Sequence, residues 1–234
     1  MKSFIRALGR EAESRATALA TNRGGETATL YFGGGTPSML SDTHLGRLME
    51  TLDRLVPVDK LDEFSFEANP ATFTEKKVRF WRSLGMTRVS LGVQSLDSGI
   101  LHLLGREHTP AQALHSVEML KNAGMAHINM DLMFAIPGQT LSIWEASLKE
   151  AVRAGTDHIS AYNLTYEEDT EFFRSLLRGE KRQDPDEDAS FFELAEHMLE
   201  AAGMRHYETS NYAREGCLSP HNMAYWKGED YVGI

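Results

Sequence analysis

Three consecutive glycines are the first residues in this chain whose spacing suggests ligand chemistry. Gly33, Gly34 and Gly35 stand directly after an apolar run and before Thr36 and Pro37. Glycine tolerates positive φ angles and has no side chain, so backbone amides and carbonyls could approach a ligand's ammonium or carboxylate there. An ordinary tight turn is the alternative interpretation. The spacing is neither the GxGxxG dinucleotide fingerprint nor a Walker loop, because the lysine of the latter is missing.

Polar residues follow each of the other β-prone runs. They are Glu67, Gln94, Ser95, Arg106, His108, Asp131, Asn163 and Thr165. Because ligands of parallel α/β folds bind at the carboxyl ends of the strands, we expect these residues to lie around one mouth. Carboxylates suit an ammonium group or ribose hydroxyls, and Arg106 suits a carboxylate. The set predicts a zwitterionic, hydroxylated ligand, although each residue taken singly could be an ordinary surface or capping residue.

The elements that would position these residues alternate between β-prone runs and helices. We expect strands at 27–32, 63–66, 88–93, 127–134 and 158–164, and helices at 2–20, 42–55, 74–84, 96–104, 110–123, 141–154, 169–177 and 187–202. Gly85, Gly124, Gly155 and Gly203 follow helix ends and predict left-handed C-caps. Residues 205–213 alternate as a strand does, and a loop is expected after them, ending in a strand-like run. This order predicts a parallel sheet wrapped by helices, closed or partly closed as a barrel.

Composition narrows the class of protein. A chain of 234 residues can form one substantial domain, and its net charge of −10 argues against a nucleic-acid partner. It has no apolar stretch of signal-peptide or membrane-span length, which predicts a soluble, cytoplasmic protein without an integral membrane segment. Cys217 is the only cysteine, so this chain alone can form neither a disulfide nor a metal cage built mainly from thiolates.

Seven ordered segments resemble the motifs of one known family. They are YFGGGTPS at 31–38, FEANP at 66–70, RVSLGVQS at 88–95, LGREH at 104–108, NMDLMFAIPGQT at 129–140, ISAYNLTYEEDT at 159–170 and HNMAYW at 221–226. Together they resemble radical S-adenosylmethionine (SAM) proteins of the oxygen-independent coproporphyrinogen III oxidase type. HNMAYW and YEEDT favour the HemW branch of that family, whose members are regarded as heme chaperones.

The resemblance implies an α/β fold, a partial (β/α) TIM-like barrel of the radical SAM type that binds SAM at its mouth. It implies SAM contacts for Gly34, Gly35, Thr36, Glu67, Gln94, Arg106, Asp131 and Thr165, and a heme contact for His221. The implied function lies in heme trafficking or porphyrin metabolism, with heme or porphyrinogen as a ligand and a heme-acceptor protein as a partner. The alternative is oxidative decarboxylation of coproporphyrinogen III.

The sequence departs from the family pattern at its cluster ligands. In the family, three cysteines in a CxxxCxxC loop hold a [4Fe–4S] cluster that reductively splits SAM, and this chain has no such motif. We therefore expect that the chain itself cannot cleave SAM reductively. Met1 falls where the helix after that loop begins, and YVGI falls before an expected glycine-rich stretch and C-terminal domain. Residues 1–234 are thus expected to be a radical SAM core domain incomplete at both ends, with the first barrel strand missing.

Other interpretations of the same residues stay open at this point. His221 is one of nine histidines and could be structural, while Tyr225 and Trp226 could stack on a porphyrin or pack within the fold. Cys217 could be a second axial ligand or a small buried hydrophobic residue. A hydrolase or lyase that uses Glu67 as acid or base is a third class, but no nucleophile, metal triad or phosphate loop accompanies it. Asp131 would be its partner carboxylate.

Overall fold

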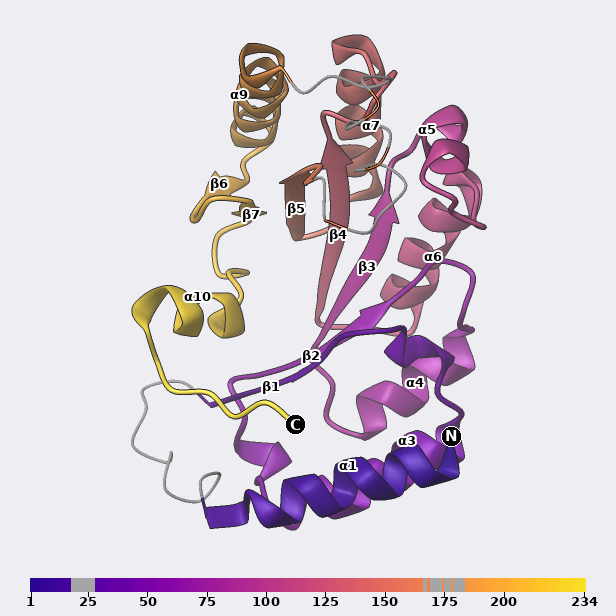
Figure 1. Cartoon of the computed structure of the whole chain (residues 1–234), viewed down its shortest axis with the longest axis vertical. Helices are drawn as coiled ribbons and strands as arrows, with labels where there is room; N and C mark the ends of the chain where they lie inside the picture. The colour runs from indigo at the N-terminus through magenta and orange to yellow at the C-terminus, as the bar shows by residue number, and fades with distance from the viewer. Residues whose placement is uncertain (18–27, 166–167, 169–173, 175–177, 179–183) are drawn as a thin grey trace. The chain divides into compact units, whose positions relative to one another are not determined.

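The computed structural model describes residues 1–17, 28–165, 168, 174, 178 and 184–234 (Figure 1). Its strands are β1 (Thr29–Phe32), β2 (Glu63–Ala68), β3 (Arg88–Gln94), β4 (His127–Phe134), β5 (His158–Asn163), β6 (Arg205–His206) and β7 (Asn211–Ala213). They form one sheet in the order β1-β2-β3-β4-β5-β7-β6. β1 and β2 are parallel, as are β4 and β5, whereas β7 is antiparallel to β5 and β6. The predicted α/β class is confirmed, and the described strands form an open sheet, not a closed barrel.

Helices follow most of the strands, as the sequence predicts. They are α1 (Lys2–Ser14), α3 (Asp42–Leu52), α4 (Glu75–Ser83), α5 (Ser98–Leu103), α6 (Pro110–Asn122), α7 (Leu141–Ala154), α9 (Pro185–Ala201) and α10 (Pro220–Lys227), with short 3₁₀ turns at Pro37–Met39 and Val58–Lys60. No helix among the described residues is long and apolar enough to cross a membrane. The end of the helix predicted at 2–20 and most of the helix predicted at 169–177 lie outside the described residues.

The chain divides into two compact units. Unit 1 comprises Met1–Ser90, Met119–His127 and Ser219–Ile234, and unit 2 comprises Leu91–Glu118 and Ile128–Leu218. The carboxyl-terminal helix α10 therefore belongs to the same unit as β1 and β2, although most of the chain lies between them in sequence. The prediction that the chain is a single core domain stays a prediction.

Side chains alternate between apolar and polar along the strands of each unit. In β2, Phe64 and Phe66 are fully buried, and the ring of Phe66 lies 4.7 Å from that of Trp81 in α4. In β4 of unit 2, Phe134 in the same way meets Trp144 of α7, with 5.7 Å between the ring centroids. Because successive strand residues point to opposite faces, the helices cover the apolar face and the polar residues lie on the other. That second face carries the candidate site residues of the strands.

One prediction about the chain's last residues is wrong. Residues 221–234 were expected to form a loop that ends in a strand-like run, but Pro220–Lys227 is helix α10 and the residues after it form no strand. The helix begins because the hydroxyl of Ser219 accepts the N–H of Asn222 at 3.2 Å and proline occupies the first helical position. It ends at Gly228, whose φ of 70° gives a left-handed C-cap. The same kind of cap, predicted at Gly155, is confirmed by its φ of 66°.

Candidate functional site

The glycine loop of unit 1 follows β1 directly. Gly34 has a φ of +82°, and a Cβ added to Gly34 or Gly35 would meet no atom within 4 Å, so the backbone there borders open space. Gly33 is different, because a Cβ at that position would overlap Cε1 of Tyr31 and lie 2.9 Å from Oε1 of Glu67. The loop therefore exposes its backbone at two glycines and makes room for two side chains at the third.

Glu67 lies beside this loop. Residues Phe32 and Phe66 are paired in the parallel register of β1 and β2, so Gly33 and Glu67 follow at the carboxyl end of the two strands. The half-buried Glu67 carboxylate accepts a hydrogen bond from the hydroxyl of Tyr31. The predicted residues Gly34, Gly35, Thr36 and Glu67 are thus neighbours at one strand end, with Asn69 Nδ2 donating to Thr36 Oγ1 at 3.4 Å.

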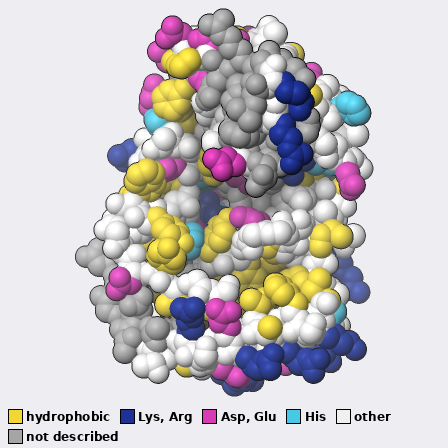
Figure 2. Space-filling view, in the orientation of Figure 1, with side chains coloured by type: hydrophobic (Ala, Val, Ile, Leu, Met, Phe, Trp, Pro, Cys, Tyr) yellow, Lys and Arg dark blue, Asp and Glu magenta, His cyan; other side chains and the backbone are white. Residues whose placement is uncertain are grey.

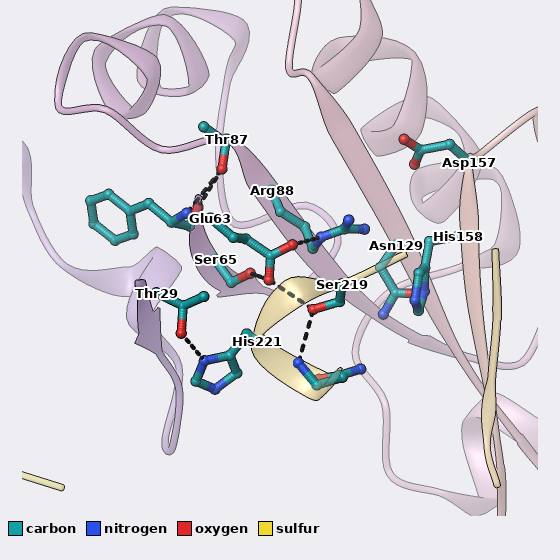
Figure 3. Close-up of polar contacts among 12 residues, drawn as sticks. Thr29, Glu63, Ser65, Thr87, Arg88, Asn129, Asp157, His158, Ser219 and His221 are labelled. Atoms are coloured by element: carbon teal, nitrogen blue, oxygen red, sulfur yellow. Dashed lines mark hydrogen bonds and ion pairs between the residues drawn. The ribbon is translucent and has the colours of Figure 1, made fainter. Parts of the chain in front are cut away.

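His221 lies on α10 and faces β1 (Figure 3). Its Nδ1 is 2.8 Å from Oγ1 of Thr29, and its ring stacks on that of Tyr31 with 4.7 Å between the centroids and 6° between the planes. The ring of Tyr225 meets it edge-on at 5.2 Å. Burial lowers the pKa of His221, and the negative charge of Glu63 acts in the opposite direction. The imidazole is therefore held in one orientation and favours the neutral form, which is the form that binds metals.

A buried polar cluster attaches α10 to the sheet of unit 1 (Figure 3). Glu63 in β2 is 2% exposed, and its Oε1 accepts hydrogen bonds from Ser219 at 2.7 Å and Ser65 at 2.9 Å. Its Oε2 pairs with Nε of the buried Arg88. Ser219 is also the N-cap of α10, so one hydroxyl both begins the helix and fixes it to β2. The position of His221 therefore depends on Glu63 and Arg88.

Three exposed aromatic residues lie on helix α10 or just after it, in unit 1. Tyr225, Trp226 and Tyr231 are 51%, 60% and 70% exposed, and Figure 2 shows hydrophobic side chains exposed over α10. The rings of Tyr225 and Tyr231 are in contact, with 5.0 Å between their centroids. Large apolar groups gathered at a surface mark a site that binds another molecule. Flat aromatic groups suit a flat, apolar ligand.

In unit 2, Arg106 and Asp131 interact electrostatically. Burial lowers the pKa of Arg106, while the charge of Asp131 acts against that change. Burial also raises the pKa of Tyr162 to about 12, and Asp131 contributes to the increase. Asp131 lies within β4, whose bounds are those predicted, and not beyond the end of the strand. The carboxylate is half-buried and close to both a guanidinium and a phenol.

A chain of hydrogen bonds fixes the orientation of Asp131. Asn129 donates from Nδ2 to Asp131 Oδ1 at 2.7 Å and to Ser160 Oγ at 2.9 Å. Its Oδ1 must then accept from Nδ1 of His158, which is 2.6 Å away. Nε2 of His158 in turn accepts from the hydroxyl of Tyr207 at 2.8 Å. Asn129 and His158 are almost fully buried, so the carboxylate of Asp131 is held by a preorganised network.

The other predicted residues of unit 2 differ in backbone conformation and in burial. Gln94 ends β3 with a φ of 68°, which is a strained conformation for a residue other than glycine. His108 is buried with Nε2 3.1 Å from the carbonyl of Val93, which indicates a structural role. Burial lowers the pKa of His108. Thr165 is exposed just beyond β5. The prediction that the residues of both units surround one mouth stays a prediction.

Two surface hollows are lined mainly by other residues, although Asn163 lines the second. One of about 380 Å³ lies between α1 and α3, and the other of about 390 Å³ lies beside α9. None of the residues predicted to bind SAM or heme lines either hollow. We therefore base the candidate site on side-chain chemistry and contacts, and not on cavity size.

Several important residues of the site were absent from the sequence prediction. Thr29, Tyr31 and Glu63 in unit 1 and Asn129 and His158 in unit 2 all contact a predicted residue or support one that does. The signal that could have identified them is the alternation within the strands, as in Glu63, Ser65 and Glu67 between apolar neighbours. A parallel strand covered by helices on both faces is apolar throughout, so this alternation indicates a polar interior face.

The donor atoms present can be compared with the groups that the resemblance implies. A [4Fe–4S] cluster needs several thiolates, and the chain has one cysteine, so the residues present do not fit the cluster. The open backbone at Gly34 and Gly35 beside Glu67 fits the amino and carboxylate groups of SAM. His221 fits an axial heme ligand, because Thr29 fixes Nδ1 and an iron bond would come from Nε2.

Residues 10–151 match the model of the radical SAM superfamily. Among curated proteins, the heme chaperone HemW of Bacillus subtilis (strain 168) is 37% identical over 208 residues, covering 88% of this chain and 55% of the relative. HemW of Escherichia coli (strain K12) is 35% identical over 218 residues, covering 92% and 56%. The mitochondrial radical S-adenosyl methionine domain-containing protein 1 of Danio rerio is 35% identical, covering 93% and 49%. The chain spans about half the length of these relatives.

Solved structures share the fold at lower identity. The coproporphyrinogen III oxidase HemN of Escherichia coli superimposes with a TM-score of 0.79 at 22% identity, over 97% of this chain and 51% of that one. An archaeal Elp3 from Methanocaldococcus infernus gives a TM-score of 0.65 at 23% identity, over 81% and 49%. At these identities the similarity shows the fold alone.

Proposed function

The chain belongs to the radical SAM superfamily, and we propose that it is the SAM-binding and heme-binding part of a HemW-like protein of heme trafficking. The observation that carries the proposal is the setting of His221. Its ring is fixed by Thr29 and Tyr31, kept neutral by burial, and bordered by exposed aromatic side chains. A cytoplasmic location and delivery of heme to an acceptor protein are part of the proposal.

SAM would bind at two sets of residues in this proposal. Gly34, Gly35, Thr36 and Glu67 would contact its methionine part, and Gln94, Arg106, Asp131 and Thr165 would belong to the SAM site or to a second-ligand site. The Glu67 carboxylate suits the ammonium group, and the Arg106 guanidinium suits a carboxylate. Because the cluster cysteines are missing, the proposal includes no reductive cleavage of SAM by this chain.

Hemin titration tests the heme part of the proposal. We expect that hemin gives a histidine-ligated Soret spectrum with the wild-type chain, and that His221→Ala weakens binding by about tenfold or more, since the axial bond is lost. His115→Ala is the matched control, because that histidine is exposed on α6 and should leave the spectrum and affinity unchanged. Identical hemin spectra for wild type and His221→Ala would refute the assignment of His221.

Calorimetric titration with SAM tests the other ligand. Glu67→Ala and Arg106→Ala should each weaken SAM binding about tenfold or more, because each removes a charge-assisted hydrogen bond. Glu75→Ala and Arg79→Ala are the controls, since these two residues form an exposed pair within α4. Equal SAM affinity in all four variants would contradict the assigned site. Oxidative decarboxylation of coproporphyrinogen III is the alternative function that the sequence motifs imply.

A further inference from the structure

We propose that Tyr31 couples the two ligand sites of unit 1, so that SAM binding at Glu67 and heme binding at His221 strengthen each other. The inference rests on the proposed function, because it requires that both ligands bind. In this proposal Tyr31 is a positioning residue and forms no bond to either ligand. The coupling would allow the chain to hold heme more tightly when SAM is present.

The geometry places one rigid side chain between the two predicted ligand contacts. The Tyr31 ring lies parallel to the His221 ring at a centroid distance of 4.7 Å, and its hydroxyl donates to the carboxylate of Glu67. A tyrosine side chain turns about only two bonds. The ring position that keeps the hydroxyl on Glu67 is therefore the one that keeps the ring stacked on His221.

Gly33 makes this arrangement possible. A methyl group at that position would overlap the Tyr31 ring and press on Oε1 of Glu67 at 2.9 Å. An alanine there would have to push the phenol away from the carboxylate, since the loop backbone follows β1 directly. The missing side chain of Gly33 thus leaves room for Tyr31 and Glu67, whereas Gly34 and Gly35 border open space.

The coupling follows from the order that each ligand imposes. Tyr31 is 39% exposed and is held through its contacts with Glu67 and His221, so a ligand that restrains either partner also restrains Tyr31. Whichever ligand binds first fixes the shared tyrosine, and the second ligand then loses less conformational entropy on binding. By linkage, SAM must raise hemin affinity by the same factor by which hemin raises SAM affinity.

The test measures hemin affinity of the full chain with and without saturating SAM. For the wild type we expect SAM to raise hemin affinity about fivefold or more, which is the lower range of measured allosteric couplings. Tyr31→Phe keeps the ring but loses the hydroxyl, so the ratio should fall to about one while the Soret spectrum with His221 stays the same. His115→Ala is the control, because that histidine is exposed on α6 and its ratio should equal that of the wild type.

Further outcomes separate the two levels of the proposal. Gly33→Ala should also remove the coupling, with circular dichroism used to check that the variant is folded. If the wild type binds neither hemin nor SAM, the proposed function is overturned and the coupling with it. If both ligands bind but each ignores the other, the coupling alone is overturned. A Tyr31→Phe variant that keeps the wild-type ratio would show that Tyr31 is not the connection.

Discussion

Buried charge in unit 1 is concentrated at Glu63 and Arg88, which are 2% and 3% exposed. Such a pair is expensive to remove from water unless other hydrogen bonds complete it, and Ser65 and Ser219 supply them to the carboxylate of Glu63. We expect the pair to contribute more to the choice of the place where α10 attaches than to the free energy of unfolding. Its negative member also acts on His221, whose pKa it raises against the larger effect of burial.

The lowered pKa of His221 predicts how heme binding depends on pH. Because burial lowers this pKa below the usual 6.5, the ring stays neutral at neutral pH and becomes protonated only at a more acidic pH. The unfolded chain takes up that proton nearer pH 6.5, so acidification below this value also removes stability, with the sign expected for a depressed histidine pKa. An NMR titration of the His221 ring should give a midpoint below 6.5, and hemin affinity should fall only in that acidic range. A midpoint above 6.5 would contradict the burial argument.

Helix α10 is the element on which the heme proposal depends. It is short, and it is attached through the bond from its N-cap Ser219 to Glu63 and through the contacts of His221 with β1. An isolated helix of this length is unstable in water, so its interactions with β1 and β2 decide whether it forms. Any change that loosens those interactions should affect hemin binding before it affects the rest of unit 1.

Two N-cap serines allow this to be tested. Ser219→Ala removes the N-cap of α10 and a hydrogen bond to buried Glu63, and should lower the free energy of unfolding by about 1–3 kcal/mol. It should also weaken hemin binding. Ser41→Ala removes the N-cap of α3, where the serine hydroxyl accepts the N–H of His44 at 3.3 Å, and should destabilise the chain by about 1 kcal/mol with unchanged hemin affinity. Denaturation curves and hemin titrations check both, and equal hemin effects for the two variants would argue against a role for α10.

The elements could be predicted from sequence, but their contacts could not. Periodic apolar residues and the glycine caps located most helices and strands to within a few residues. The helix signals of α10 were also present, in Ser219, Pro220 and Gly228, but the polar and aromatic residues between them favoured the prediction of a loop. The bond between Thr29 and His221 joins residues 192 positions apart, and no local pattern encodes such a distance. The sequence did not predict that Gly33 differs from Gly34 and Gly35, because its role depends on side chains from two strands.

At the scale of the whole molecule, the chain has the superfamily's fold but not its cluster ligands. Residues 10–151 match the radical SAM superfamily, and the chain spans about half the length of its curated relatives. In the proposed function, this chain supplies the residues that would bind SAM and heme, whereas it has no set of thiolates for the cluster.

The cysteine count leads to a prediction about reconstitution. When the purified chain is incubated anaerobically with iron and sulfide, we expect no visible absorption of a [4Fe–4S] cluster and no stoichiometric acid-labile sulfide, because one thiolate cannot hold it. Cys217→Ser is the control and should give the same spectrum as the wild type. One cluster per chain, lost in Cys217→Ser, would contradict the prediction.

Successive side chains of a strand point to opposite faces of the sheet, and this two-residue period limits the insertions and deletions that β2 can accept. A single residue inserted at the start of β2 would turn Phe64 and Phe66 toward the ligand face and turn Glu63 and Glu67 toward the helices. The buried guanidinium of Arg88 would lose its partner, and the glycine loop would face a phenyl ring in place of a carboxylate. We expect natural variants of this chain to gain or lose single residues in the loops between elements, whereas within β2 only changes by pairs of residues would keep the ligand face polar.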